Sequence, residues 1–528
     1  MGKYLFKRIL FSILSLIVVV GIVMLLVYTA IHRNVIFQTD DLWNKKNLND
    51  RTMYEYTLYQ KYGYLNYVDY GSFLKGKYEP LYGPEYETQK DYIDDLAALK
   101  KADTAMDNPS VQEFKAKYES QGYKVTYLEP VTYKNGRQKP GGRPYLIAVE
   151  EKSVFSRLWN YFTHIITFES TSDVKDPALT DRYVRLEKDP YSGLFAVVGN
   201  GTQHKYLLYF DNDFPYIHQN WMHFKLGTSY TVERGVEITK TITKPTGNMV
   251  MSDLTFPKWL GTGRTEYTAI DIHSHTYNMG KLTPGEIERY NDKYTVPTTV
   301  YSGLTPIGNS FVIGIIATAI AYILGIMIGI TMARHKDKLV DHLGNAYIVF
   351  VTAVPSLAYI FIVASIGTQV FKLPLKFATA QVKALAYIMP TISLSLGAIG
   401  SEMKWTRRYM IDQMNSDYVK FARAEGMSER EIYNIHIARN AMIYIVQGIP
   451  SSILFALTGA LLTERVYGVP GVGGLLITAI NAHDNAVIVA MTLILTAISI
   501  AGQILGDLLL AKYDPRISLS TDSGGGRK

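Results

Sequence analysis

Six stretches of the chain carry no charged residue over lengths that suit a membrane crossing. At 1.5 Å of rise per residue, about 20 apolar residues in a helix cover the roughly 30 Å hydrocarbon core of a bilayer. One such stretch could be a buried helix of a large soluble protein, but six together favour a polytopic helical membrane protein. The predicted transmembrane helices are residues 9–31, 309–333, 343–371, 384–401, 440–463 and 485–506.

The first and second stretches are separated by a long segment with the pattern of a soluble domain. β-branched and aromatic residues predict strands at 124–128, 143–149, 205–210 and 235–242, and helical spacing predicts a helix at 91–101. Asn135-Gly136 and Gly141-Gly142 are turn signals between strands. We expect an α+β domain, rich in antiparallel strands, over residues 33–300.

Eleven tyrosines lie between Tyr54 and Tyr92, mixed with Lys, Asp and Glu. A tyrosine-rich surface suits adaptable contact with a partner, because the ring gives area and the hydroxyl gives a hydrogen bond. The simpler interpretation is that these rings pack at the boundary between helices and loops. We expect packing, with a docking surface for a partner protein as the alternative.

The charges give the predicted helices an orientation. If both ends lie inside the cell, the cytoplasmic segments are 1–8, 334–342, 402–439 and 507–528, and together they carry 17 Lys and Arg. This bias agrees with the rule that basic loops stay on the cytoplasmic side. The loop that carries Lys372, Lys376 and Lys383 runs against it. Residues 32–300 would then lie outside, with 33 Lys and Arg against 34 Asp and Glu.

The first apolar stretch follows Lys3, Lys7 and Arg8, as the core of a secretory signal would. With 23 residues it is too long for such a core, and no small-x-small cleavage site follows it. We expect a retained transmembrane helix.

Several kinds of chemistry find no support in the sequence. The chain has no cysteine, which excludes disulfides and thiolate metal sites. It has no Gly-x-x-x-x-Gly-Lys-Ser/Thr phosphate loop, so any ATP hydrolysis linked to its function would have to take place on another chain. Asp271, His273 and His275 would share one face of a strand, but a His-x-His pair without a third ligand is a weak zinc signal. We expect no metal and no catalytic residues.

The polar, basic segment after the fourth stretch has the pattern of two helices joined by a sharp turn. Gly426 can end the first helix, because glycine takes the left-handed conformation without steric penalty. Ser428-Glu-Arg-Glu431 is typical of a capping box, which would begin a second helix at once. Held at a membrane surface, such a pair would give a partner protein a rigid knob to grip.

The run Tyr418-Val-Lys-Phe-Ala-Arg-Ala-Glu-Gly426, with His436 and Arg439-Asn440-Ala441, resembles the cytoplasmic coupling loop of ABC-importer permeases of the oligopeptide/dipeptide (Opp/Dpp/Ami) family. Thr463-Glu-Arg-Val-Tyr467, Pro470-Gly-Val-Gly473 and Asp514-Pro-Arg-Ile517 are similar to that branch as well. General importer loops have Glu-Ala-Ala where this chain has Lys420-Phe-Ala422, so their Glu contact with the ATPase is not transferable. Residues 204–210 and 218–220 resemble the long AmiC-type permeases of streptococci and their relatives.

This resemblance implies the type I permease fold, with a core over 301–518 that includes a coupling loop at 402–440. It implies four kinds of partner: a second homologous permease, two cytoplasmic ATPases that carry ATP and Mg, an extracellular substrate-binding lipoprotein, and a peptide. The broken segment 466–483 would be an external re-entrant or interfacial element. The implied coupling residues are Tyr418, Lys420, Ala422, Arg423, Ala424, Glu425, Gly426, Ser428, His436, Arg439 and Asn440.

Few polar residues lie inside the predicted spans. A peptide crossing a bilayer needs hydrogen-bond partners without tight charge traps, and hydroxyls and amides supply them. The alternative is ordinary hydrogen bonding between helices. The candidates for the translocation path are Gln447, Ser451, Ser452, Thr458, Thr463 and Glu464.

We therefore expect a multi-pass plasma-membrane protein of a Gram-positive bacterium. Its parts would be a first span at 1–32, an extracellular domain at 33–300, a permease core at 301–518 and a disordered tail at 519–528. Its function would be that of a non-enzymatic permease subunit of an ATP-driven oligopeptide importer, with no nucleic-acid partner. Two alternatives remain, the same architecture for a dipeptide, nickel or another small solute, and a membrane-anchored surface enzyme or sensor.

Overall fold

The computed structural model describes residues 2–513 apart from 38–39, 83–89, 91–93, 95–96, 98–106, 174–179, 190–191, 203, 211–216, 244–248, 256–295 and 302–303. The helix expected at 91–101, the histidine pair His273 and His275, and the tail 519–528 lie wholly or mostly outside the described residues.

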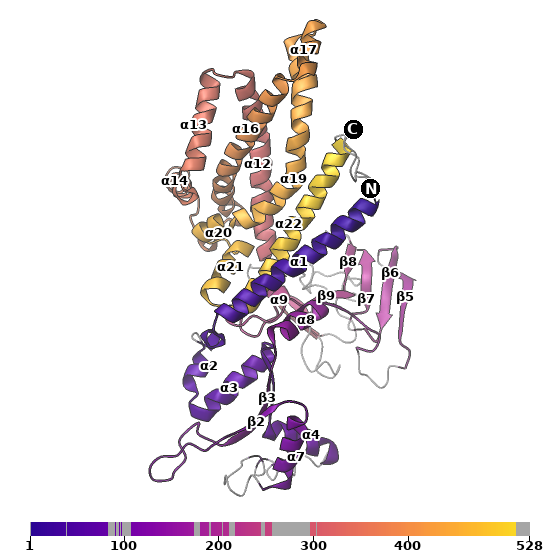
Figure 1. Ribbon diagram of the computed structural model, residues 1–528, viewed down its shortest axis with the longest axis vertical. Helices are drawn as coiled ribbons and strands as arrows, with labels where there is room; N and C mark the ends of the chain where they lie inside the picture. Colours follow the sequence, from indigo (N-terminus) through magenta and orange to yellow (C-terminus); the bar gives the residue numbers. More distant parts are fainter. Residues whose placement is uncertain are drawn as a thin grey trace, which may run out of the picture.

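Long apolar helices form one half of the molecule (Figure 1). Among the described residues, four helical segments are long and apolar enough to cross a membrane: Phe6–Ala30, Pro306–Arg334, Lys383–Met414 and Asn485–Lys512. They correspond to α1 (Gly2–Ala30), α12 (Pro306–Arg334), α15 and α16 (Lys383–Ala386, Ile388–Met414) and α22 (Asn485–Tyr513). These helices confirm the polytopic helical class and match the first, second, fourth and sixth predicted stretches.

The third predicted stretch is not one helix. α13 (Leu339–Ala353) and α14 (Ser356–Gln369) meet at a bend of 108°. The cause is Pro355, since the residue before a proline is driven out of helical geometry, and Val354 has φ −80° and ψ 130°. The prediction of one continuous helix over 343–371 is therefore wrong, while the crossing of the membrane by the bent pair as one broken span stays a prediction.

The fifth stretch corresponds to α19 (Arg439–Gly459), a helix of 21 residues with Pro450 inside it. The broken segment after it folds as two short helices, α20 (Leu461–Tyr467) and α21 (Val472–Asn481). Gly468 ends α20 with a φ of +64°, in the left-handed region that glycine adopts without strain. The predicted interruption of the helix at 466–483 is thus confirmed, while the side of the membrane on which it lies remains a prediction.

Two glycines bring α12 and α16 into close packing. A Cβ atom on Gly325 would lie 2.5 Å from Cβ of Glu402, and one on Gly329 would lie 2.7 Å from Cβ of Thr406. Small residues four positions apart let helix backbones approach closely, as is common between membrane helices. This contact fixes the position of α16, which continues past the predicted end of its span at residue 401 and leads directly into the coupling segment.

The N-terminal part of the soluble domain is an antiparallel sheet with order β1-β3-β2, covered by helices. Its registers pair Leu65 with Glu151 and Lys124 with Val149. The strands expected at 124–128 and 143–149 are confirmed. The elements are η1 (Arg33–Phe37), α2 (Asp41–Lys45), α3 (Leu48–Lys61), β1 (Leu65–Asp69), α4 (Tyr70–Tyr82), α7 (Pro109–Glu119), β2 (Lys124–Leu128), β3 (Tyr145–Glu151) and α8 (Val154–His164).

A four-stranded antiparallel sheet, β5-β6-β7-β8, and two two-stranded ribbons complete the described domain. The strand expected at 205–210 is confirmed as β7, whereas the one expected at 235–242 is wrong because residues 238–243 form helix α9. The elements are β4 (Ile166–Phe168), β5 (Tyr183–Lys188), β6 (Phe195–Asn200), β7 (Tyr206–Phe210), β8 (Ile217–Gln219), β9 (Met222–Phe224), α9 (Ile238–Thr243), β10 (Met249–Thr255) and β11 (Val296–Tyr301).

Part of the tyrosine-rich stretch lies in the hydrophobic core. Tyr59, Tyr62, Tyr64 and Tyr67 are all buried, together with Val487 and Met491 of α22, in one apolar cluster. The packing interpretation is confirmed for these rings, and they are not available as a docking surface. The soluble domain and the C-terminal helices therefore share a hydrophobic core.

A buried carboxylate holds the same junction together. Oδ2 of Asp484, in the turn before α22, accepts hydrogen bonds from the backbone N–H groups of Tyr230, Thr231 and Val232 at 2.8, 2.9 and 3.1 Å. The hydroxyl of Ser229 donates to the same atom at 2.7 Å. A carboxylate that accepts several N–H bonds is strongly bound, so this loop of the domain is locked onto the start of α22.

Candidate functional site

The candidate coupling segment lies at the end of the helical half that points away from α4 and α7 (Figure 1). α17 (Asp417–Ala424) follows α16 after a two-residue turn. Its buried face consists of Val419 and Ala422, which pack with Met410, Ile432 and Ile437 in one cluster. The first of the two helices expected around Gly426 is confirmed.

Gly426 ends α17 as predicted. Its φ is +82°, its N–H donates to the carbonyl of Arg423 at 3.1 Å, and the N–H of Met427 donates to the carbonyl of Ala422 at 3.2 Å. These two bonds form a Schellman motif, which satisfies carbonyls left free at a helix end. Met427 packs against the Ala422 cluster, as the motif favours. The turn is therefore fixed by backbone geometry and by apolar contact.

Ser428 begins the second helix through a complete capping box. Its Oγ accepts the N–H of Glu431 at 3.3 Å, and the Glu431 carboxylate accepts the N–H of Ser428 at 3.1 Å. α18 (Glu429–Glu431) runs through a π-helical segment, Ile432–Ala438, into α19. π-helical turns are rare overall, and those that occur often lie at functional sites.

Hydrogen bonds and ion pairs hold the two arms of the turn together. Arg423 Nε donates to Glu429 at 2.8 Å, and this guanidinium lowers the pKa of the Glu429 carboxyl. The Tyr418 hydroxyl bonds to the side chain of Gln413 and lies 3.4 Å from the carbonyl of His436. Asn440 Nδ2 donates to the same carbonyl at 2.8 Å. The predicted residues Tyr418, His436 and Asn440 therefore support the turn from within.

Of the remaining predicted coupling residues, Ala422 is buried in the apolar cluster and the others face outward. Phe421 also belongs to this outer face and was not among the predicted site residues, although its side chain is 70% exposed. Its position in sequence, between the buried Val419 and Ala422 of a short amphipathic helix, is the signal that could have found it. The exposed members are Lys420, Arg423, Ala424, Glu425, Gly426, Ser428 and Arg439.

The candidates for the translocation path are separated in the structure. Glu464 is completely buried, where it accepts bonds from Ser310 Oγ at 2.5 Å and from the N–H of Gly474 at 3.0 Å. The hydroxyl of buried Thr463 donates to the carbonyl of Ala460. The Glu464 side chain therefore holds α20 against α12 and α21, whereas the Thr463 bond lies at the start of α20. Ser452 bonds to the Tyr322 hydroxyl at 2.9 Å, while Gln447 and Ser451 are partly buried on α19. The side chain of Thr458 lies outside the description.

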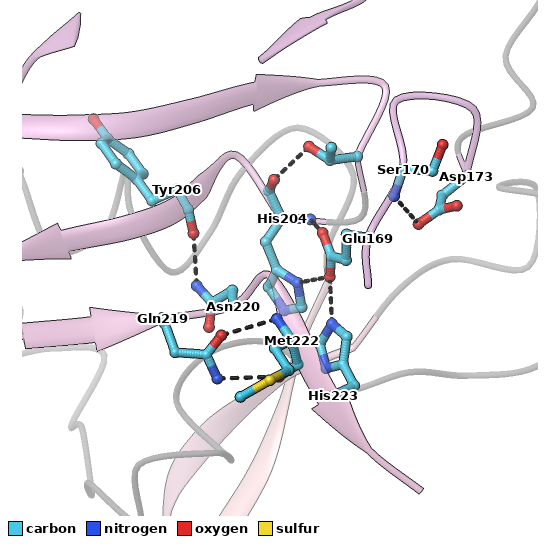
Figure 2. Close-up of polar contacts among 10 residues, drawn as sticks. Glu169, Ser170, Asp173, His204, Tyr206, Gln219, Asn220, Met222 and His223 are labelled. Carbon is cyan, nitrogen blue, oxygen red and sulfur yellow. Dashed lines mark hydrogen bonds and ion pairs between the residues drawn. The ribbon is translucent and has the colours of Figure 1, made fainter. Parts of the chain in front are cut away.

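The sequence predicted no metal site, and the weak His273 and His275 signal lies outside the described residues. Among the described residues, one group of side chains could hold a metal ion. It consists of Glu169, His204 and His223, with two of the three buried (Figure 2). The single Glu and the two His are far apart in sequence, so no spacing rule could have found them.

Comparisons with known proteins place this architecture in a class. Residues 325–519 match the family model of the binding-protein-dependent transport system inner membrane component. The oligopeptide transport system permease protein AmiC of Streptococcus pneumoniae is 34% identical over 535 residues, which cover 99% of this chain and all of AmiC. The chain is thus a polytopic helical permease subunit.

Shorter relatives match the chain in part. The dipeptide transport system permease protein DppB of Lactococcus lactis is 33% identical over 40% of this chain and 69% of its own length. The metal-staphylopine import system permease protein CntB of Staphylococcus aureus is 30% identical over 40% of this chain and 66% of its own. With the full-length match, these similarities show that the chain belongs to the Opp/Dpp/Ami family of ABC-importer permeases. Subunits of this family are not enzymes, and their ATPases are separate chains.

Proposed function

We propose that this chain forms half of the translocation pathway of an ATP-driven oligopeptide importer. A second homologous permease completes the pore, two cytoplasmic ATPases grip the coupling segments, and an extracellular lipoprotein delivers the peptide. The similarity to AmiC over the whole chain supports oligopeptides as the substrate class. DppB and CntB match less than half of it, so a dipeptide or a metal complex is the second candidate.

The capped turn from α17 to α19 is the observation that carries the proposal. It presents Phe421, Lys420 and Glu425 on a rigid backbone, while the opposite face of α17 is anchored in the apolar cluster. Such a knob transmits rigid-body motion, as a switch between inward-open and outward-open states requires. A membrane-anchored enzyme or sensor would not require a capped pair of helices on its cytoplasmic side.

In this proposal the chain crosses the plasma membrane of a Gram-positive bacterium six times, with both termini in the cytoplasm. Two features support a common side for the termini. α1 lies beside α22 in Figure 1, and Arg8 near one end of the chain pairs with Asp507 near the other at 3.2 Å. The domain at 33–300 would then be extracellular, next to the pore mouth.

The translocation path is proposed to include Gln447, Ser451, Ser452 and Thr458 of α19. Thr463 and Glu464, with their side chains held inside the packing of α20, are proposed to set the shape of that path without contacting peptide. The extracellular domain would orient the lipoprotein through exposed residues and not through the buried tyrosines.

Co-purification tests the assembly. The tagged chain is expressed with its partner permease and with the two ATPases, and we expect all four to elute together in detergent. Phe421→Asp should release the ATPases, because it places a charge at the centre of the contact, while the two permeases stay paired. Lys134→Asp, in an exposed turn of the soluble domain, is the control. Retention of the ATPases by the Phe421 variant would contradict the proposed contact.

A further inference from the structure

Three distant segments of the soluble domain bring one carboxylate and two imidazoles together. Glu169 follows the last residue of β4, His204 precedes β7, and His223 lies in β9, where its backbone pairs with Thr167 of β4. Figure 2 shows the Glu169 carboxylate between the two rings. The side chains of Glu169, His204 and His223 are 1%, 3% and 25% exposed. The cluster is therefore built into the domain rather than lying on its surface.

All three side chains converge on one point. Oε1 of Glu169 bonds to Nδ1 of His204 and, at 2.8 Å, to Nε2 of His223. Oε2 accepts the backbone N–H of His204 at 3.0 Å, which fixes the carboxylate plane. One ligand atom from each residue lies within 4.8 Å of the other two.

We propose that Glu169, His204 and His223 bind a divalent transition-metal ion, with zinc as the ion that fits the ligand set. Two imidazole nitrogens and one carboxylate oxygen are a familiar zinc set, with bonds of about 2.0–2.2 Å. Bonds of that length in a tetrahedron separate neighbouring ligand atoms by about 3.3 Å. Both contacts to Oε1 have to open, the one from the buried His204 further than the one from His223. The partly exposed His223 ring has room to move.

A hydrogen-bonded triad without metal is the competing interpretation. In that form each imidazole donates a proton to the same carboxylate oxygen. A metal ion replaces those protons, since ligand histidines bind through a neutral nitrogen. The two forms differ in whether the purified protein holds a metal ion.

The site adjoins a large cavity. A volume of about 1440 Å³ lies between α1, α8, the β4–β9 ribbon and the start of α22, and both Glu169 and His223 line it. Three protein ligands leave a fourth position open on zinc, where water or a ligand donor atom binds. That position can be reached from the cavity, beside Asp173 and Gln219.

Metal binding would cross-link the domain. The ion joins the β4–β9 ribbon to the turn between β6 and β7, which belong to different sheets. The chain contains no cysteine, so a disulfide cannot supply such a link. Because the ion binds the folded form, it stabilises that form in proportion to the logarithm of its free concentration.

The test measures metal content of the full-length protein in detergent. The protein is stripped with a chelator, equilibrated with Zn²⁺ or Co²⁺ and desalted, and the metal per chain is measured by mass spectrometry. We expect one Zn²⁺ per chain and, with Co²⁺, the intense visible bands of a four-coordinate ion. Even outer partners of a metal site change affinity by about 10–100-fold, so His223→Gln should weaken Zn²⁺ binding by at least about tenfold.

The controls separate loss of a ligand from loss of fold. His164→Gln changes an exposed histidine of the same domain that is outside the cluster, and it should keep the full zinc content. His223 is chosen over the buried Glu169 because a partly exposed side chain permits a milder change. The elution profile of each variant checks its fold. Equal zinc content in the wild type and a folded His223→Gln variant would overturn the proposal, and so would a wild type without zinc-dependent thermal stabilisation.

Discussion

At the scale of single residues, Gly426 carries the turn of the coupling segment. No heavy atom lies within 4 Å of a Cβ built on it, so a side chain meets open space and the penalty is purely conformational. A left-handed backbone costs an L-residue about 1–2 kcal/mol, and more when the residue is β-branched. We expect Gly426→Val to lower uptake and transport-stimulated ATPase activity while the chain still inserts.

The matched control for this prediction is Gly426→Asn, because asparagine tolerates the left-handed region. It should keep most of the activity. Uptake assays in cells that depend on the importer, with membrane levels of each variant determined by blotting, make the comparison. Normal uptake by the valine variant would mean that the turn does not transmit the motion.

Asp484 is the residue that locks the soluble domain to α22. Asp484→Asn removes the charge and turns one acceptor into a donor that faces the N–H groups of residues 230–232. Hydrogen bonds to charged groups contribute about 1.5–3 kcal/mol, so we expect the free energy of unfolding to fall by about 2 kcal/mol. Asp507→Asn disrupts the partly exposed pair with Arg8 and should cost less than about 1 kcal/mol. Thermal unfolding in detergent measures the stability of both variants. Equal losses of stability in the Asp484 and Asp507 variants would contradict the proposed lock between the domain and α22.

At the scale of elements, the contact between α12 and α16 depends on two glycines. A side chain at 329 would meet Cβ of Thr406 at 2.7 Å and the carbonyl of Met403 at 2.9 Å. Forcing extra carbon atoms into a close contact costs about 1–3 kcal/mol, and Gly329→Val should reduce thermal stability accordingly. Ile323→Val, on an outward-facing part of α12, is the control and should behave as wild type.

Because α16 runs directly into α17, the α12–α16 contact also sets the position of the coupling segment. We therefore expect a milder variant, Gly329→Ala, to reduce coupling between ATP hydrolysis and uptake more than it reduces stability. If coupling and stability fell in parallel across the two Gly329 variants, the contact would have only a structural role.

At the scale of the whole molecule, the proposed topology puts the soluble domain outside the cell. Protease added to intact protoplasts should cleave within residues 32–300 and leave a tag after Lys528 intact. As a control, the same tag should be cleaved when the protoplasts are broken open, because the protease then reaches the cytoplasmic side. Cleavage of the C-terminal tag from outside would overturn the six-span arrangement.

The shared core makes a further whole-molecule prediction. Removing residues 35–205 takes away Ile36, Tyr59 and Tyr64, which are part of the apolar cluster around Val487 and Met491 of α22. We expect the shortened chain to lose yield and thermal stability instead of behaving as an intact permease. Removal of 520–528, beyond the family-matched segment, is the control. A fully stable deletion would show that the helices hold without the domain.

Local patterns allowed part of this structure to be predicted. Gly426 and Ser428 act through their own neighbours along the chain, so the helix end and the capping box could be predicted to the residue. The apolar stretches followed from composition alone, because a bilayer demands continuous apolar length. Pro355 was visible in the third stretch, but the size of the bend depends on what α13 and α14 pack against.

The sequence by itself determined the membrane class, the positions of most long helices and the capped turn of the coupling segment, since each depends on residues within one or two helical turns. Only the tertiary structure decided which polar groups meet. The burial of the tyrosines, the lock between Asp484 and residues 229–232, and the cluster of Glu169, His204 and His223 all join segments far apart in the chain. Side-chain spacing within a segment cannot predict such contacts, because they depend on how separate elements pack around a shared core.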